Sequence, residues 1–363
     1  MKLRTLVLLT LIPSTVGLTL FLEGWHYRSG QRSALEATQE DLSSTTVEVI
    51  GHLDTFLSIP QSLITLNRSA LEQGHLTLNN WPILESYFQN QVQSFQSITS
   101  LSFTNAEGAM VGAGRDSLGV IDQSGSIVVW EALATTNFSR RFYRPWPENS
   151  SSQPNPALLR DRPILHETPN FNPQETLSYQ TALQSQSQTW TPIAQDVTLP
   201  IVSISAVAPV YQSGQFRGVL SADLLISDFD LFLRDVSAQD RTEIIILDRS
   251  GTGIASSFAA DPTPTATDPF SPKAQSLLQQ LRRQYPSLNQ IQTPTTLPLT
   301  LPLDSTPRQV QMTPYQDGYG LDWLIVTTLP LAEYQHSWET FLWGALGLGG
   351  LVCLAVGGTG YWV

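Results

Sequence analysis

The sequence predicts an α+β protein in which a long N-terminal helix precedes two tandem antiparallel-sheet units, with an apolar segment at each end of the chain. Three observations support this fold class. Apolar residues recur at helical spacing after the first apolar segment, turn-and-strand patterns recur in the same order, and 363 residues with 41% hydrophobic content suffice for two cores.

The apolar segments are candidates for membrane helices. The first four residues include two that are basic, and residues 5–22 are uncharged and mostly apolar, as are residues 340–363. Each run is long enough to cross about 30 Å of hydrocarbon at about 1.5 Å per residue. The first run lacks a small-x-small cleavage signature, which favours an uncleaved anchor over a signal peptide. We therefore expect transmembrane helices within residues 1–24 and 338–363.

Charge predicts the orientation of the chain. The basic start places the N-terminus in the cytoplasm, so residues 25–337 should lie outside the inner (plasma) membrane of a two-pass protein. All 31 acidic residues lie between the two apolar runs, and the net charge is −12. Such a surface repels phosphate backbones, so we expect no nucleic-acid partner. The chain stops at "GYWV" without a Lys/Arg-rich segment, and we expect that a cytoplasmic output part is missing.

The sequence offers little catalytic or metal-binding chemistry. Its one cysteine, Cys353, lies in the second apolar run, so no disulfide is expected. The five histidines are too dispersed for a metal-ligand motif. There is no phosphate-binding loop and no nucleophile elbow. We expect no cofactor, no metal and no enzymatic activity in this chain.

Helical patterns come first along the chain. Apolar spacing predicts a long helix over about residues 30–59, within a membrane-adjacent helical segment that spans 25–75. Pro60 should bend or end this helix. A second helix is expected over residues 81–95, and a connecting helix over residues 225–236.

Strand and turn patterns then recur. "SLSFTNAEGAMVGAG" and "EIIILDRSGTGIASS" each place a Gly-containing turn between two apolar strands. "APVYQSGQFRGVLSADLLI" and "MTPYQDGYGLDWLIVTTLP" share a Tyr-Gln-x-Gly turn. One such match arises easily because turns recruit the same few residues, but four turns in matching order indicate a duplicated unit. We expect a distal unit over residues 76–236 and a proximal unit over 237–337, with exposed Pro-rich inserts "PENSSSQPNP" and "DPTPTATDPF".

This organisation resembles the double Cache domains of bacterial receptors. The basic start, the anchor, the long helix, two PAS-like units and a second membrane helix are common to both. Locally, "NFNPQETLSYQTALQSQSQTWTPI" and "ISAVAPVYQSGQFRGVLSADLLISDF" are similar to Cache domains of cyanobacterial sensor kinases and cyclases. The resemblance implies that the membrane-distal unit binds a small molecule and that a cytoplasmic kinase, cyclase or chemotaxis module carries the output.

The resemblance also implies site residues. Amino-acid-binding members carry an Arg-x-Trp-Tyr pattern on a helix, whose Tyr matches Tyr179 here, whereas Thr176 and Ser178 stand at the Arg and Trp positions. A later family Trp matches Trp190. The acidic residue that receives the ligand's ammonium group matches Asp223. Without the Arg, a ligand carboxylate loses a pair worth about 1.5 to 3 kcal/mol, which disfavours plain amino-acid recognition.

Other residues are candidates for the missing contact. Arg140, Arg141 and Arg144 in "SRRFYRPW" are possible substitute donors, and Asp196 in a predicted loop is a further candidate. Each candidate also has a structural explanation, because aromatic residues pack into cores, arginines solvate surface strands and Asp residues occupy turns. The expected ligand is a small polar molecule: an amine, an amino-acid-like compound or an organic acid.

Three hypotheses follow. The first is the sensing and membrane-anchoring part of a receptor, dimerising through its long helix. The second is a ligand-free dimerisation or interaction module with a degenerate pocket. The third is an anchored extracytoplasmic enzyme, disfavoured because no nucleophile, base and orienting group are visible together.

Overall fold

The computed structural model describes residues 3–78, 80–145, 162–197, 199–240, 242–258, 271–300 and 307–330. The helix α1 spans Leu3–Glu72, and its side chains are described from Leu35 onward and at two earlier positions. The second apolar run and both Pro-rich inserts lie outside the described residues. Among the helices of the described part of the chain, none has the length and apolar content that a membrane crossing needs. Both membrane spans stay predictions.

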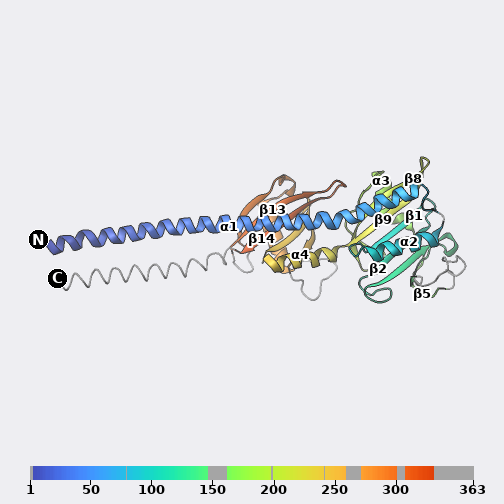
Figure 1. Ribbon diagram of the computed structural model, residues 1–363, viewed down its shortest axis with the longest axis horizontal. Coiled ribbons are helices and arrows are strands. Elements are labelled where there is room, and N and C mark those ends of the chain that lie inside the picture. Colours follow the sequence, from blue (N-terminus) through green and yellow to red (C-terminus); the bar gives the residue numbers. More distant parts are fainter. Residues whose placement is uncertain are drawn as a thin grey trace.

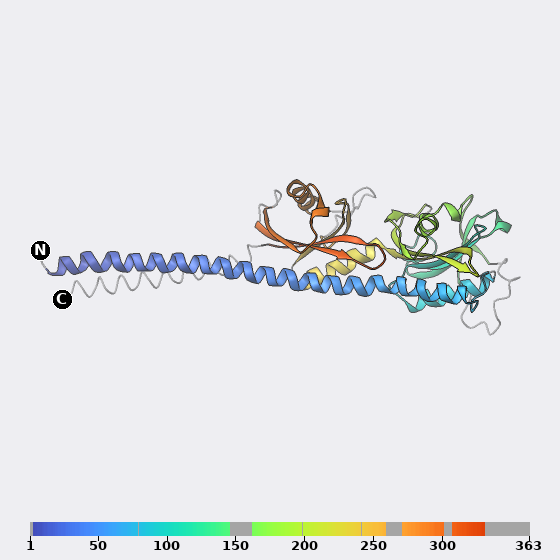
Figure 2. The same cartoon turned by 90° about the horizontal axis from the view of Figure 1, so that it is seen from above.

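The helix α1 connects the two sheet units. It extends past one unit and then lies along the other (Figures 1 and 2). We expected Pro60 to bend or end this helix. It does not end the helix, because α1 continues to Glu72. Proline removes one intrahelical hydrogen bond. However, Leu57 and Leu63 on either side are buried, and packing of an apolar face supplies most of a helix's stability in a protein.

The distal unit is built on a nine-stranded sheet in the order β5-β4-β3-β2-β1-β9-β8-β6, with β7 paired to β8. Every pairing in it is antiparallel. Its strands are β1 (Ser100–Asn105), β2 (Met110–Asp116), β3 (Ser126–Ala132), β4 (Arg140–Tyr143), β5 (Ile164–Thr168), β6 (Thr189–Trp190), β7 (Ala194–Gln195), β8 (Val202–Gln212) and β9 (Gln215–Leu225). Its helices are α2 (Trp81–Ser94) and α3 (Leu177–Ser185), with short 3-10 turns at Ala134–Thr136 and Pro173–Glu175.

The two faces of the distal sheet differ, because neighbouring residues of a strand point to opposite sides. One face is covered by α1, which packs on β8 and β9, and by α2, which packs on β2. It carries large buried residues such as Phe103 and Leu220. The opposite face, called the second face below, carries buried hydroxyl groups, among them those of Ser102 and Ser221. The alternation places Asp223 on the same side as Ser221.

The proximal unit repeats this plan with a five-stranded antiparallel sheet in the order β11-β10-β14-β13-β12. Its strands are β10 (Glu243–Asp248), β11 (Gly253–Ser256), β12 (Thr295–Thr300), β13 (Pro307–Gln316) and β14 (Asp322–Pro330). Its helices are α4 (Ile226–Asp240), which enters from the distal unit, and α5 (Pro272–Gln284), with a 3-10 turn at Leu288–Gln290. Three leucines of α5 pack into a core with alternate residues of β10, β13 and β14, so this helix covers one face of the proximal sheet.

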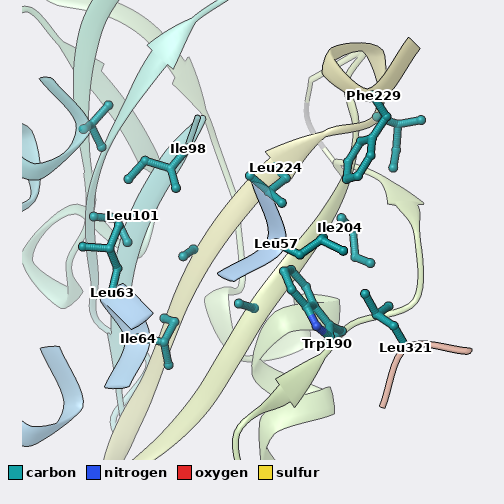
Figure 3. Close-up of a cluster of buried hydrophobic side chains, with 14 of the residues drawn as sticks. Leu57, Leu63, Ile64, Ile98, Leu101, Trp190, Ile204, Leu224, Phe229 and Leu321 are labelled. Atoms are coloured by element: carbon teal, nitrogen blue, oxygen red, sulfur yellow. The ribbon is translucent and has the colours of Figure 1, made fainter. Parts of the chain in front are cut away.

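The two units touch where the β13–β14 turn meets the distal unit. The Trp190 indole Nε1 donates a hydrogen bond of 2.6 Å to Asp317 Oδ2, and Thr189 Oγ1 donates one of 3.0 Å to the Tyr319 carbonyl oxygen. Leu321 and Leu57 belong to the same buried cluster as Trp190 (Figure 3). We call this set of contacts the junction.

A buried charged cluster fixes the outer strands of the distal unit beneath α2. Arg162 donates two hydrogen bonds to the Glu85 carboxylate, at 2.7 and 2.8 Å, and only 9% and 6% of the two side chains are exposed. The guanidinium also lies 4.6 Å from the ring centroid of Tyr143. Tyr143 in turn donates a hydrogen bond of 3.1 Å to Glu131. The pair therefore joins α2 to the chain segment that leads into β5.

Glu131 makes the stability of this cluster dependent on pH. Burial raises the pKa of Glu131 above its ordinary value, and the hydrogen bond from Tyr143 opposes this only in part. Burial and the Glu131 charge raise the pKa of Tyr143 to about 12. Because the folded state keeps the Glu131 proton to higher pH than the unfolded state, the free energy of unfolding falls as pH rises from the ordinary Glu pKa to the raised value.

We expect Glu131→Gln to remove this loss, because the amide stays neutral and still accepts a hydrogen bond from Tyr143. The variant and the wild type should differ little near about pH 4, and the variant should be the more stable at about pH 7. Thermal unfolding across this range measures the difference. A difference that stays constant with pH would contradict the role given to Glu131.

Candidate ligand-binding site

A cavity lies on the second face of the distal sheet, opposite α1 and α2. The cavity and the open solvent at its mouth together amount to about 650 Å³. Strands β1, β2, β3, β4, β8 and β9 contribute to its walls, and so do the loops that follow β2 and β7. Apolar residues form about half of the wall. Five charged residues also line it: Arg115, Asp116, Arg140, Asp196 and Asp223.

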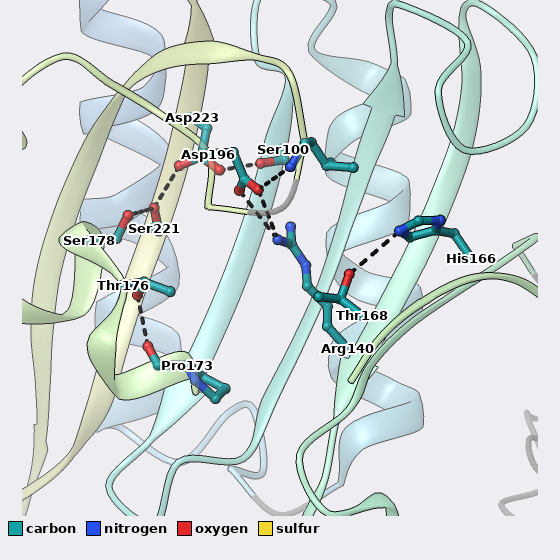
Figure 4. A network of polar contacts seen from close by, with 11 residues as sticks. Ser100, Arg140, His166, Thr168, Pro173, Thr176, Ser178, Asp196, Ser221 and Asp223 are labelled. Atoms are coloured by element: carbon teal, nitrogen blue, oxygen red, sulfur yellow. Dashed lines mark hydrogen bonds and ion pairs between the residues drawn. The ribbon is translucent and has the colours of Figure 1, made fainter. Parts of the chain in front are cut away.

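Asp223 lies at one side of the cavity with both carboxylate oxygens engaged. Ser100 Oγ donates to Oδ2, and Ser221 Oγ donates to Oδ1 at 2.7 Å. Ser221 Oγ is in turn 3.3 Å from Ser178 Oγ of α3 (Figure 4). Each carboxylate oxygen has two acceptor sites, so these bonds leave capacity for a ligand donor. Ser178, at the position where the family pattern has a Trp, thus connects α3 to the acidic group.

Arg140 lies at the opposite side of the cavity, and three aromatic rings pack against its guanidinium group. Its guanidinium carbon is 5.4 Å, 4.8 Å and 5.1 Å from the ring centroids of Trp130, Phe142 and Phe171. Its Nη1 is 3.3 Å from Asp196 Oδ2 (Figure 4). The rings hold the planar cation by cation–π attraction, and the long contact with Asp196 neutralises it in part.

Two loops form the mouth. Asp116 ends β2, and its carboxylate accepts the backbone N–H groups of residues 120, 121 and 122 at 2.9, 2.8 and 2.7 Å, which fixes the first loop. Asp196 accepts the Leu199 N–H at 2.9 Å and fixes the second. Leu118 and Val120 on the first loop are 54% and 42% exposed although they line the cavity. An apolar ligand group at the mouth would bury them.

Glycines in β2 make room for the floor of the cavity. A Cβ atom at Gly112 would lie 2.4 Å from the Trp130 ring, and one at Gly114 would lie 2.9 Å from it. The indole therefore lies flat over these two residues. Its Nε1 is buried without a hydrogen-bond partner in the described part of the chain.

The two predicted aromatic contacts lie elsewhere. Tyr179 is buried on α3 against Val207, Val219 and Phe216, and its hydroxyl accepts a hydrogen bond of 3.3 Å from Gln174. Trp190 belongs to the junction with the proximal unit. Neither residue lines the cavity. Both side chains are explained by packing, and their assignment as ligand contacts stays a prediction.

Two of the three predicted arginines lie outside the cavity. Arg141 follows Arg140 in β4, so its side chain lies on the opposite face of the sheet. Its Nε donates a hydrogen bond of 2.8 Å to Glu167, and this bond lowers the pKa of the Glu167 carboxyl. Arg144, at the end of β4, is 68% exposed and binds Asp122 at 2.9 Å. Of the candidates, the structure brings together Asp223, Asp196 and Arg140, and it separates Arg141 and Arg144 from them.

The sequence analysis did not predict some of the residues that line the cavity. The glycine pair of "MVGAGRD", two residues apart on one face, is the local signal for a large side chain lying over β2, and it points to Trp130. Asp116 ends a strand before a loop, which is typical of a turn residue, and the structure assigns it that role. Within the described residues, no group of three His, Cys, Asp or Glu side chains is placed to hold a metal ion.

Known proteins with this arrangement are found among solved structures. The structure of "Methyl-accepting Chemotaxis protein X" matches with a TM-score of 0.51 and 12% identity, over 82% of this chain and 99% of that chain. The fold is that of a double Cache domain. The double Cache fold expected from the sequence is thus confirmed, and at this identity the likeness concerns the fold alone.

Two further matches have lower TM-scores. The ligand-binding domain of the Pseudomonas fluorescens chemoreceptor CtaA in complex with L-isoleucine has a TM-score of 0.48 and 17% identity, over 83% of this chain and 98% of that one. The sensory domain of the Campylobacter jejuni chemoreceptor Tlp3 has a TM-score of 0.49 and 13% identity, over 86% and 99%. No protein-family model and no curated protein matches the chain.

Proposed function

We propose that this chain is the small-molecule-sensing and membrane-anchoring part of a signal-transduction receptor. The observation that carries the proposal is the cavity on the second face, in which Asp223 and Arg140 lie among apolar walls. The double Cache fold, shared with a protein named as a methyl-accepting chemotaxis protein, supports the sensor class. In this proposal, kinase or cyclase activity belongs to a cytoplasmic part and not to this chain.

The proposed receptor is a two-pass protein of the bacterial inner membrane with residues 25–337 outside. It forms a homodimer through the free face of α1. Val47 and Leu66 are 69% and 62% exposed on this helix, and a Cβ at Gly51 between them would meet nothing within 4 Å. Apolar and small residues on a helix surface allow a second helix to approach closely, which supports the dimer.

The proposed ligand is an amine with an apolar body. Asp223 offers acceptor capacity for an ammonium group, and the apolar walls and exposed Leu118 offer area for the body. A carboxylate group of a ligand would pair with Arg140, and it would compete there with the Asp196 carboxylate. The 3.3 Å between Arg140 Nη1 and Asp196 Oδ2 is long for an ion pair. Amino-acid-like compounds and organic acids therefore rank after amines.

Three probes with nearly the same branched alkyl body test this order: 3-methylbutylamine, leucine and 4-methylpentanoate. We expect 3-methylbutylamine to raise the melting temperature of the purified chain with concentration, as any ligand of the folded state does. Asp223→Asn should weaken its binding about 10- to 150-fold, because a charged hydrogen bond is lost. Glu167→Gln, on the opposite face, is the matched control and should bind as the wild type does.

The outcomes separate the hypotheses. Binding that Asp223→Asn leaves unchanged would place the ligand elsewhere. Tighter binding of 4-methylpentanoate than of the amine would assign the site to organic acids through Arg140. If no member of a wider panel of amines, amino acids and organic acids binds, the ligand-free dimerisation module is the better description.

A further inference from the structure

A second cavity lies next to the end of α1 in the distal unit. Figure 1 shows this end of α1 on the side of the molecule away from the N-terminus. We call this cavity the apex cavity; together with the open solvent at its mouth it amounts to about 880 Å³. Three chain turns meet there: the loop after α1, the β1–β2 turn and the β8–β9 hairpin. The polar and charged side chains of its lining include those of Asn105, Glu107, Gln212 and Arg217. None of them lines the cavity that contains Asp223.

A β-bulge places Arg217 at this cavity. Val210 pairs with Gly218, but the next residue, Tyr211, pairs with Phe216, so Arg217 is the extra residue of β9. Such a bulge redirects the side chain of the inserted residue. Gly218 fixes the bulge, because it has a φ of 152° and a Cβ there would lie 2.2 Å from the Thr104 carbonyl oxygen. The backbone of the bulge and of Gly218 therefore fixes the position of Arg217.

The lack of an ion pair within the described residues distinguishes Arg217 from the other arginines that have a buried nitrogen. Five arginines of the described chain have a buried nitrogen without a hydrogen-bond partner: Arg140, Arg162, Arg217, Arg249 and Arg308. Four of the five bind a carboxylate through another nitrogen. For Arg217, no ion pair exists within the described residues. A partly buried guanidinium without a counterion is costly, and an anion from outside would relieve that cost.

The lining selects the kind of anion. A guanidinium holds a carboxylate through two parallel N–H···O bonds. Asn105 uses its Oδ1 for the backbone N–H groups of residues 107 and 109, so its amide NH₂ stays available as a donor. Gln212 adds a second amide side chain. The exposed Glu107 carboxylate repels multivalent anions and accepts a hydroxyl or amino group. We infer that the apex cavity is a second binding site, which takes a small monocarboxylate bearing a hydroxyl or amino group.

Calorimetric titration of the purified full chain tests this site with lactate, glycine, succinate and inorganic phosphate as probes. We expect lactate or glycine to bind, and Arg217→Gln to weaken that binding by at least about 10-fold, since the charged pair is lost. Arg141→Gln is the control, because it removes an arginine that already pairs with Glu167 at 2.8 Å. This variant should bind lactate and glycine as the wild type does.

A second variant keeps the test decisive if Arg217→Gln does not fold. Arg217→Lys retains the charge but cannot form the two parallel bonds, and it should also bind about 10-fold more weakly than the wild type. The inference is overturned if neither lactate nor glycine binds, or if Arg217→Lys binds them as tightly as the wild type. Tighter binding of succinate or phosphate than of the monocarboxylates overturns the assigned ligand class.

Discussion

Replacement of Glu85 by alanine is expected to destabilise the distal unit by about 3 to 5 kcal/mol, because it leaves the buried Arg162 guanidinium without its counterion. Both side chains are almost fully buried, and the pair is bidentate. On an unfolding scale of about 2 to 4 °C per kcal/mol for a unit of this size, the melting temperature should fall by roughly 6 to 20 °C. Thermal unfolding of the purified chain, followed by circular dichroism, measures the change.

Two further variants separate burial from charge. Glu167→Ala removes the corresponding carboxylate of the solvent-exposed pair with Arg141, and we expect little change in stability, because water and salt screen an exposed ion pair. Replacing both Glu85 and Arg162 by methionine should recover most of the loss, because no unpaired charge remains. If Glu85→Ala costs no more than Glu167→Ala, the buried pair does not fix the outer strands.

The sequence contains enough information for the fold because local and global preferences agree. The turns at residues 105–108 and 213–214 use glycine and asparagine where the backbone needs them, and each joins strands that pair as expected. The helix over residues 81–95 is observed as Trp81–Ser94, with buried residues at positions 84, 88 and 92. The end of α1 was harder to predict, since a proline preference competes there with packing that only the folded chain supplies.

The candidate site was less predictable, because it depends on which face of a strand each side chain takes and on what lies opposite. Asp223 follows from alternation in β9, since it shares a face with Ser221. Arg140 and Arg141 are neighbours of the same type, and only the register of β4 against β3 assigns Arg140 to the cavity. Trp190 lies in the two-residue strand β6, and the hydrogen-bond partner of its indole, Asp317, is 127 positions away in the sequence. No short-range pattern contains that contact.

Trp190→Ala is expected to destabilise the chain by about 3 to 5 kcal/mol, the range for removing a buried tryptophan. The indole is buried against Leu57 and Leu321, and its N–H donates to Asp317. Trp190→Phe keeps most of the apolar contact and removes the hydrogen bond to the carboxylate, at a cost of about 1.5 to 3 kcal/mol. Denaturant unfolding of both variants measures the two contributions.

Hydrogen exchange reports where the junction opens. The N–H groups of Tyr319 and Leu321 donate to Asp317 Oδ1 at 2.9 and 2.8 Å, so they are reporters of the β13–β14 turn. In Trp190→Phe we expect faster exchange in this turn and unchanged exchange in α5, because the turn loses its distal partner while the proximal core is untouched. Trp323→Phe is the control. The Trp323 ring lies 6.0 Å from the Phe229 ring, and its replacement should not produce faster exchange confined to the β13–β14 turn.

The same variant separates sensing from transmission. Trp190 does not line the cavity, so Trp190→Phe should leave the affinity for a ligand beside Asp223 unchanged. A ligand shifts the proximal unit only if its free energy of binding differs between two arrangements of the junction. Ligand-dependent exchange in β13 and β14 should therefore be reduced in Trp190→Phe at full occupancy. If it is retained, α1, which packs on both sheets, is sufficient to carry the change between the units.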